Sequence, residues 1–293
     1  MTDDIAVTGA TGQIGRRLAA RLTDSGVSPR LLVRASSAGL DLPGGVPVPI
    51  GAGYADTAAV RGALDGVGTL FLVSARESAD RVAEHRAVVD SAVAAGVQRI
   101  VYLSFLGAAP DCTFTFGRDH WHTEQHIRST GVAFTFLRDS FYASMLPALV
   151  GSDGVLRGPG GEGRVSAVAP DDVADVAAAV LTASTPGASP HDGRTYDVTG
   201  PSAITLAEAV EELSGRVGRA LRYQPETEAE AYASRAGYGA AEFEVAGWVT
   251  SYLAIADGSL STVTDTVPRL TGHPACTFAR YLDAYPGSYA HLR

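Results

Sequence analysis

The sequence contains no lysine, and all 23 of its Lys+Arg positions are arginine. This absence excludes each mechanism that requires a lysine amine. The protein cannot form a lysine Schiff base and cannot hold nucleotide phosphates with the lysine of a Walker-type loop. It also cannot use a paired tyrosine and lysine to protonate an alkoxide. A coding bias toward arginine explains the composition, and the chemical exclusion holds whatever its origin.

Cysteine and long apolar runs are also scarce. Only Cys112 and Cys276 occur, without a CxxC pair, so we expect ordinary thiols, no disulfide scaffold and no metal site. No apolar run approaches the roughly 20 residues of a membrane helix, and the first residues lack a leader pattern, so we expect a cytoplasmic protein without membrane contact. The net charge of −9, with no arginine cluster, argues against nucleic-acid partners.

The stretch IAVTGATGQIGRRLAARL, residues 5–22, has the pattern of a strand, a tight turn and a helix. An apolar run suited to a buried parallel strand comes first, and apolar residues recur at helical spacing from Ile14 onward. Gly9, Gly12 and Gly15 allow the turn, bring the backbone close to a pyrophosphate and let the helix pack on the strand. The first N–H groups of the helix then bind the phosphates. A plain capped turn would use similar glycines, but the strand that follows favours a dinucleotide site.

Arg34 comes directly after that next strand, which is predicted at residues 31–33. An acidic residue at this position would bind the ribose 2′-hydroxyl of NAD, whereas an arginine suits the 2′-phosphate of NADP. The alternative is a solvated arginine at the end of a strand. Together with the glycine turn, Arg34 favours NADP(H) as the cofactor.

Strand and helix patterns alternate along the first half of the chain. Further strands are predicted at 46–50, on a sheet edge because of its prolines, and at 69–73, 99–103, 134–137 and 195–198. Helices are predicted at 57–64, 82–95, 119–129 with an acidic N-cap, 173–183, 206–213 and across most of 229–260. The glycine-rich residues 151–163 are predicted to form a surface turn or hairpin.

This alternation predicts an α/β fold, a Rossmann doubly wound parallel sheet in the order 3-2-1-4-5-6 with helices on both faces. At 293 residues the chain is long enough for a large core. We expect an NAD(P)-binding domain over 1–150 and a smaller, partly helical substrate-binding lobe over 151–293, interleaved with the sheet. The ligand crevice lies at the carboxyl ends of the strands, so Val73, Ser74, Ala75 and Ser104 are expected at the cofactor.

Several segments together resemble one family. They are VTGATGQIG, LLVR, AGVQRIVYLSFLGA, HWHTEQHIRSTG, FTFLRDSFY, YDVTGPSAITLAEAVEELSGRVGRALRY and LTGHPACTFARYL. They resemble the NmrA-like group of atypical short-chain dehydrogenase/reductases, in particular its NAD(P)H:quinone oxidoreductase type 2 branch. The resemblance covers nearly the whole chain.

The resemblance implies site residues. Those expected at the dinucleotide are Gly9, Thr11, Gly12, Gln13, Ile14 and Arg34, and Ser74 and Ala75 match the loop that passes the cofactor. His120, four residues before Glu124, stands where relatives often place a lysine at the nicotinamide ribose. The usual Tyr-xxx-Lys pattern becomes Phe116-xxx-His120, which has lost the acid and its partner. Relatives often have an aspartate near the adenine, where this chain has GAGY at 51–54, and Asp56 is a weak substitute.

The missing tyrosine acid restricts the chemistry. Reduction of an isolated ketone makes a strongly basic alkoxide that needs a proton from the protein. Reduction of a quinone makes a phenolate whose conjugate acid has a pKa of about 10, by analogy with tyrosine. Hydride transfer to such an acceptor needs mainly proximity and orientation. A small-molecule quinone or conjugated carbonyl is therefore the expected substrate.

An apolar pocket is expected near the carboxyl ends of the strands at 99–103 and 134–137. Its candidate lining residues are Phe105, Leu106, Trp121, Phe141, Tyr142 and Met145, although Phe105 and Met145 also suit the core. His120 and His122 are the ionisable groups there that titrate near neutral pH, and they are the candidate catalytic residues. His126 is expected to face solvent, and His85 to pack or lie on the surface.

Three functions fit these observations. The first is an NADPH-dependent oxidoreductase for quinones or conjugated carbonyls. The second is a non-catalytic NADP(H)-binding sensor of the NmrA type, which the eroded acid site also allows. The third, a sugar-nucleotide epimerase, fits the fold but is disfavoured by the absent Tyr-Lys pair. The sequence leaves monomer and homodimer open.

Overall fold

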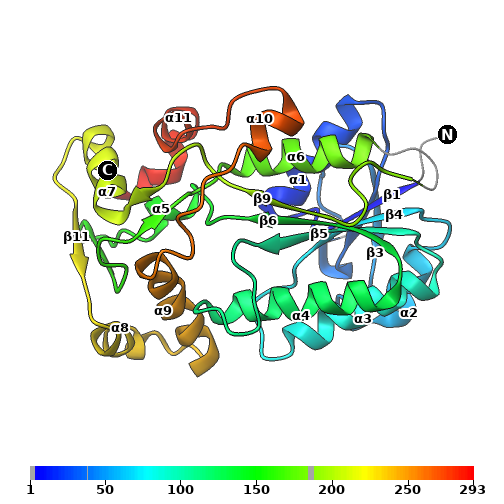
Figure 1. Cartoon of the computed structure of the whole chain (residues 1–293), viewed down its shortest axis with the longest axis horizontal. Coiled ribbons are helices and arrows are strands. Elements are labelled where there is room, and N and C mark those ends of the chain that lie inside the picture. The colour runs from blue at the N-terminus through cyan, green and yellow to red at the C-terminus, as the bar shows by residue number, and fades with distance from the viewer. Residues whose placement is uncertain (1–3, 38, 184–187) are drawn as a thin grey trace.

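The computed structural model describes residues 4–37, 39–183 and 188–293, and its centre is a seven-stranded sheet (Figure 1). The strand order is β3-β2-β1-β4-β5-β6-β9, with parallel pairing throughout. The strands are β1 (Ile5–Thr8), β2 (Arg30–Val33), β3 (Val46–Pro49), β4 (Thr69–Val73), β5 (Arg99–Phe105), β6 (Ala133–Asp139) and β9 (Arg194–Val198). The predicted order of the first six strands is confirmed, and β9 adds a seventh at the edge beside β6.

Side chains of the central strands alternate between two apolar cores because successive residues of a strand point to opposite faces. On β5, Val101 and Leu103 belong to one core, and Ile100 and Tyr102 to the other. Figure 1 shows the helices in two layers. α1 (Gln13–Asp24), α6 (Pro170–Thr182) and α10 (Thr266–Thr271) cover the first face. α2 (Thr57–Ala63), α3 (Arg81–Ala94) and α4 (Thr115–Thr130) cover the second.

Helix α4 begins at Thr115, four residues before the predicted start. Its N-cap is Phe114, whose side chain makes no capping hydrogen bond, so the predicted acidic N-cap at Asp119 is wrong. The extra turn brings Phe116 and His120 onto one face, since residues four apart lie above one another on a helix. That face points into the site described below.

The rest of the chain has its own core at the end of the sheet, which contains Leu156, Leu206 and Tyr252. Its elements are α5 (Met145–Ala148), β7 (Val155–Gly158), β8 (Arg164–Val165), β10 (Ile204–Thr205), α7 (Leu206–Val217), β11 (Arg222–Pro225), α8 (Glu228–Arg235), α9 (Glu242–Ala256) and α11 (Phe278–Ala284), with the short 3-10 helices η2 (Ala236–Tyr238) and η3 (Pro286–Leu292). Another 3-10 turn, η1 (Ala35–Ser37), follows β2. Although β9 and α6 come late in the sequence, they belong to the layers of the large sheet (Figure 1).

One prediction for this later part differs from the structure. Residues 151–163 are not a surface turn, because β7 pairs in parallel with β11 and is largely buried. The glycine at 158 allows this packing, since a Cβ there would lie 2.4 Å from the Tyr252 ring. The prediction that 229–260 is largely helical agrees with the structure, in which this segment contains two helices, α8 and α9. They are separated by η2 and by Gly239, whose φ of 67° is a left-handed conformation that suits glycine.

Among the described residues, no helix combines the length and apolar character needed to cross a bilayer.

The contact between α4 and α9 gives a test of the packing. A Cβ at Gly247 on α9 would lie 2.2 Å from Cε2 of the buried Phe116 ring. We expect Gly247→Ala to lower the free energy of unfolding by about 1–3 kcal/mol, because the added methyl overpacks the contact. The measurement is urea denaturation.

Gly215→Ala on α7 is the matched control, because a Cβ there meets nothing within 4 Å. Alanine at an exposed helix position stabilises by about 0.5–1 kcal/mol relative to glycine. Equal effects of the two substitutions would contradict the described contact.

Candidate functional site

The turn between β1 and α1 is shaped to accept a phosphate. Gly9 has a φ of 61°, and a Cβ there would lie 2.9 Å from Val73 Cβ. A Cβ at Gly15 would lie 2.4 Å from the Gly9 carbonyl oxygen, so a larger residue would push α1 away from the turn. Helix α1 starts at the N-cap Gly12 without a side-chain cap and without an acidic residue in its first turn. Its first N–H groups are therefore available to an anion, which fits a pyrophosphate.

The other predicted dinucleotide residues lie around this turn. Thr11, Gly12 and Gln13 are exposed, whereas the Ile14 side chain is buried in the core, so only its backbone can face a phosphate. Arg34 is exposed at the carboxyl end of β2. Among the described residues, its guanidinium makes no hydrogen bond or ion pair. It is free to meet a 2′-phosphate.

The loop after β4 is held in place by two buried side chains of α3. Nε2 of His85 accepts a hydrogen bond of 2.8 Å from the Ala75 N–H, and Nε of Arg81 donates one of 3.1 Å to the Ala75 carbonyl. Burial, together with the nearby Arg81 charge, lowers the pKa of His85 to about 3. The expectation that His85 packs is met, but its hydrogen bond to the predicted cofactor loop had no signal in the sequence.

The GAGY segment has a structural role on the other side of this loop. The Tyr54 hydroxyl donates a hydrogen bond of 2.7 Å to the Val73 carbonyl, and burial raises the pKa of that phenol. Asp56 accepts a hydrogen bond of 3.2 Å from the Ala59 N–H as the N-cap of α2. This cap occupies one of its carboxylate oxygens, which weakens Asp56 further as an adenine contact.

A cavity of about 830 Å³ opens beyond the carboxyl ends of β4, β5 and β6. This size is typical of sites for small ligands, and the carboxyl edge of a doubly wound sheet is where such ligands bind. The predicted lining residues Phe105, Phe141, Tyr142 and Met145 do line it, together with Val73, Ser74, Ser104 and His120. The far wall comes from the later elements and includes Tyr238, Trp248 and Tyr252.

Three predicted pocket or catalytic residues lie outside this cavity. Leu106 is buried in the core near α5 and α7. Trp121 is half-buried and His122 is exposed, and their rings pack edge to face 5.0 Å apart. His122 is about 200° around α4 from His120, so the two side chains cannot face the same space. The structure therefore gives no support to Leu106 or Trp121 as lining residues or to His122 as a catalytic residue.

His120 lines the cavity, but both of its ring nitrogens are engaged. Nε2 lies 3.1 Å from a guanidinium nitrogen of Arg81, and Nδ1 lies 3.0 Å from the Tyr102 hydroxyl. Because a guanidinium only donates, Nε2 must be the acceptor and Nδ1 carries the hydrogen. Burial, followed by the charge of Arg81, lowers the pKa of His120 well below its usual value. At neutral pH the ring is uncharged and directs its N–H at Tyr102, which does not suit the predicted proton shuttle.

A buried ion pair lies behind Ser104, which lines the cavity. Glu124 on α4 is fully buried and accepts two hydrogen bonds from Arg138 on β6, of 2.8 and 2.7 Å. The Ser104 hydroxyl donates a third bond of 2.7 Å to the same carboxylate. This network ties α4 to the ends of β5 and β6. It also directs the Ser104 hydroxyl at Glu124, which leaves its backbone to face a cofactor.

Two polar residues on the cavity wall form a pair that the sequence analysis did not predict. The Tyr142 hydroxyl donates a hydrogen bond of 2.5 Å to a carboxylate oxygen of Asp139, whose side chain is buried. Burial raises the pKa of Asp139 to about 8. Burial and the neighbouring Asp139 raise the pKa of Tyr142 well above that of free tyrosine. The sequence FTFLRDSFY places both residues at the end of a strand, but burial of the carboxyl group depends on the tertiary structure.

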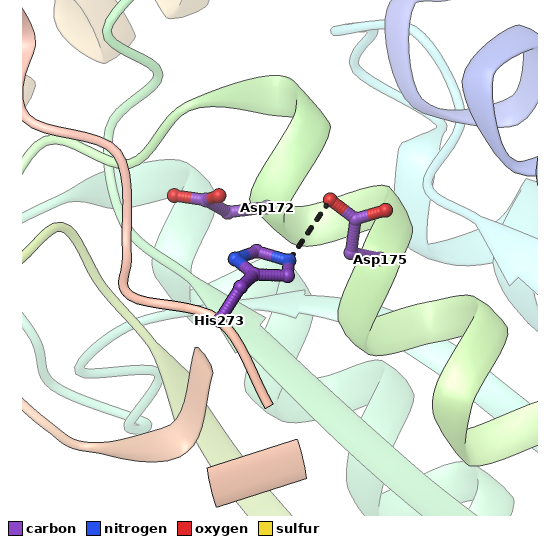
Figure 2. A group of neighbouring side chains, drawn as sticks. All are labelled: Asp172, Asp175 and His273. Carbon is purple, nitrogen blue, oxygen red and sulfur yellow. Dashed lines mark ion pairs between the residues drawn. The ribbon is translucent and has the colours of Figure 1, made fainter. Parts of the chain in front are cut away.

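A second polar cluster lies outside the cavity, where α6 meets the segment after α10 (Figure 2). Ligand-type atoms of Asp172, Asp175 and His273 lie within 4.8 Å of one another, and His273 Nε2 is 3.4 Å from Asp175. Asp175 also pairs with Arg21, and Asp172 accepts a hydrogen bond of 2.7 Å from the Cys276 N–H. These contacts already join α1, α6 and the chain after α10.

Comparisons with known proteins agree with this geometry. A family of proteins described as NAD(P)H-binding matches residues 9–184. The chain belongs to this NAD(P)H-binding family. It is 36% identical to a (4-alkanoyl-5-oxo-2,5-dihydrofuran-3-yl)methyl phosphate reductase of Streptomyces griseus, over 98% of this chain and 99% of the relative. It is 32% identical to an NAD(P)H azoreductase of Xenophilus azovorans, over 97% of this chain and 99% of the relative.

A solved structure supports the same assignment for this NAD(P)H-binding family member. The NADPH complex of the NADPH-dependent quinone oxidoreductase 2 of Escherichia coli matches with a TM-score of 0.83 and 30% identity, over 96% of this chain and 99% of that one. The negative transcriptional regulator NmrA matches at 16% identity and a TM-score of 0.77, over 99% of this chain and 97% of that one, which shows the shared fold alone. The predicted NmrA-like resemblance is confirmed. The protein is an NAD(P)H-dependent oxidoreductase with NADP(H) as its cofactor.

The buried His85 ring predicts a pH dependence of stability. The folded ring stays neutral down to a pKa of about 3, whereas an unfolded histidine takes up a proton below about 6.5. The contribution of His85 is therefore present above pH 6.5 and is lost as the pH falls. We expect the difference in unfolding free energy between the wild type and His85→Gln to shrink below that pH, by up to about 1.4 kcal/mol per pH unit.

Denaturant unfolding at a series of pH values measures this difference. Glutamine removes the titrating ring but keeps an acceptor for the Ala75 N–H. His122→Gln, at an exposed ring of α4, is the control that leaves both buried imidazoles in place. A pH-independent difference for His85→Gln would show that His85 is not held neutral by burial.

Proposed function

We propose that the protein transfers hydride from NADPH to a quinone or a related conjugated carbonyl compound. The observation that carries the proposal is the cavity of about 830 Å³, which adjoins the predicted cofactor loop and has several aromatic side chains in its walls. Flat conjugated molecules fit such walls by stacking. The curated relatives act on an azo compound, a quinone or an unsaturated furanone, according to their names, and each of these acceptors is conjugated.

The chain's own residues supply binding, orientation and exclusion of water. The first turn of α1 would hold the pyrophosphate, and Arg34 would pair with the 2′-phosphate. The loop at 73–75, fixed by His85 and Arg81, would pass the bound nucleotide. When bound, NADPH supplies the hydride, and the aromatic walls hold the acceptor against it in a near-attack geometry.

We propose that the enzyme is cytoplasmic and acts on a small-molecule acceptor. The sensor function remains the competing proposal because it needs the same cofactor site. A protein that only binds the cofactor has no need of space beyond the nucleotide, whereas this cavity extends from Val73 and Ser74 to Trp248 on α9. This extent is the reason to favour catalysis.

Turnover separates the two proposals. Purified protein is mixed with NADPH and a panel of benzoquinones and naphthoquinones, and absorbance of the reduced cofactor is followed. We expect many turnovers per protein molecule with at least one acceptor. Tight NADPH binding without consumption by any acceptor would favour the sensor.

Arg34→Glu tests the cofactor preference. A charge-assisted contact to the 2′-phosphate contributes about 1.5–3 kcal/mol, so its loss raises the KM for NADPH by about tenfold or more. The KM for NADH should change little, because NADH has no 2′-phosphate. Arg222→Glu, at an exposed arginine on β11, makes the same change of charge away from the site. An equal loss of NADPH affinity in both variants would point to a general charge effect.

A further inference from the structure

Tyr142 and Asp139 form a hydrogen-bonded pair on the wall of the cavity. We propose that the Tyr142 hydroxyl donates the proton that accompanies hydride transfer, and that Asp139 behind it restores that proton. Tyr142 would then be a catalytic residue, and Asp139 a positioning residue that acts through it. The inference rests on the proposed reductase function and deepens it, because it supplies an acid in a chain that has lost the usual Tyr-Lys pair.

The backbone around Tyr142 is rigid and lies next to the cofactor turn. The Val168 N–H donates to the Phe141 carbonyl at 2.9 Å, and the Ala143 N–H donates to the Val168 carbonyl at 2.8 Å, so Tyr142 is held from both sides. The Ser144 hydroxyl donates a bond of 2.9 Å to the Gln13 side chain at the start of α1. Tyr142 is therefore positioned between the phosphate-binding turn and the substrate cavity.

Both members of the pair face the cavity, where an acceptor would lie. Asp139 is at the carboxyl end of β6 and is 4% exposed, so its carboxyl group has little access to water except through the cavity. Tyr142 is partly exposed and covers it. Of the two side chains, Tyr142 is the more exposed to a substrate oxygen in the cavity.

Charged groups near Asp139 come from several elements. Arg81 on α3 and Tyr142 favour the carboxylate, but burial outweighs both and raises the pKa of Asp139 to about 8. Arg138, next in sequence, is engaged by Glu124. Glu77 and the neutral His120 also line the cavity. At neutral pH, Asp139 therefore carries a proton. The hydrogen bond of 2.5 Å then runs from the Asp139 carboxyl group to the Tyr142 oxygen, the reverse of the bond to the carboxylate described above, and the Tyr142 hydroxyl turns toward the cavity.

The proton transfer balances with hydride addition. The electron pair enters the acceptor with the hydride, and negative charge develops on an acceptor oxygen. That oxygen forms a bond to the Tyr142 proton as the phenolic O–H bond breaks. The Tyr142 oxygen takes the proton of Asp139, which becomes a carboxylate and regains a proton from water after the product leaves. The sum is acceptor plus NADPH plus one proton, giving the reduced acceptor and NADP⁺.

Tyr142→Phe is the direct test, with turnover of a quinone measured under saturating NADPH. A positioned acid contributes about 100-fold or more to a rate, so we expect kcat to fall by at least about tenfold while the Kd for NADPH by calorimetry stays unchanged. Tyr232→Phe is the matched control, because it removes a phenolic hydroxyl on α8 from a side chain that does not line the cavity.

The pH profile tests the role of Asp139. In the wild type, kcat should be full below about pH 8 and decline as the pH rises through that value, because the carboxyl group loses its proton. Asp139→Asn keeps a hydrogen-bonding side chain of the same shape but has no proton to give. We expect this variant to lose that decline and to have a lower kcat. A solvent deuterium isotope effect on wild-type kcat should be absent in Tyr142→Phe.

Two results would overturn the relay and leave the proposed function standing. The first is a kcat of Tyr142→Phe that equals the kcat of the wild type. The second is a decline of kcat near pH 8 in Asp139→Asn that equals the decline in the wild type. This test does not depend on whether Tyr142→Phe folds. By contrast, a wild-type protein that oxidises no NADPH with any acceptor would remove the proposed function itself.

Discussion

The close approach of Gly15 to the Gly9 carbonyl oxygen is the constraint on which the site depends. It lets α1 start directly after the turn, with uncapped N–H groups facing outward. The same turn packs against Val73, so the end of β4 and the phosphate-binding turn are fixed relative to each other. Since the cavity begins at Val73 and Ser74, the position of the cofactor turn also sets the position of the cavity.

A histidine, His120, stands where the family resemblance places a lysine, and a buried arginine contacts it. The buried Arg81 guanidinium contacts the Ala75 carbonyl, the Phe116 carbonyl and His120, and so joins the loop after β4 to α4. His120 thus becomes part of a polar support and is not an independent acid. The proposed proton relay therefore uses Asp139 and Tyr142, at and just after the end of β6.

Much of the fold could be predicted because it depends on local patterns. The apolar runs of β4 and β5 and the glycine turn identify a doubly wound sheet without knowledge of tertiary contacts. The start of α4 could not be predicted, since Phe114 gives no capping signal. As a result, the sequence predicts the wrong face of α4 toward the cavity and favours Trp121 and His122 as site residues. Asp139 and His85 were also beyond reach, because their chemistry comes from burial, which residues distant in sequence create.

The most direct measurement of the central claim is single-turnover oxidation of NADPH deuterated at C4, one face at a time, with a naphthoquinone in excess. The account predicts that one label slows the loss of reduced cofactor, that the other does not, and that the quinone is consumed in equal amount. Equal rates for both labels with no loss of quinone would contradict hydride transfer into this cavity.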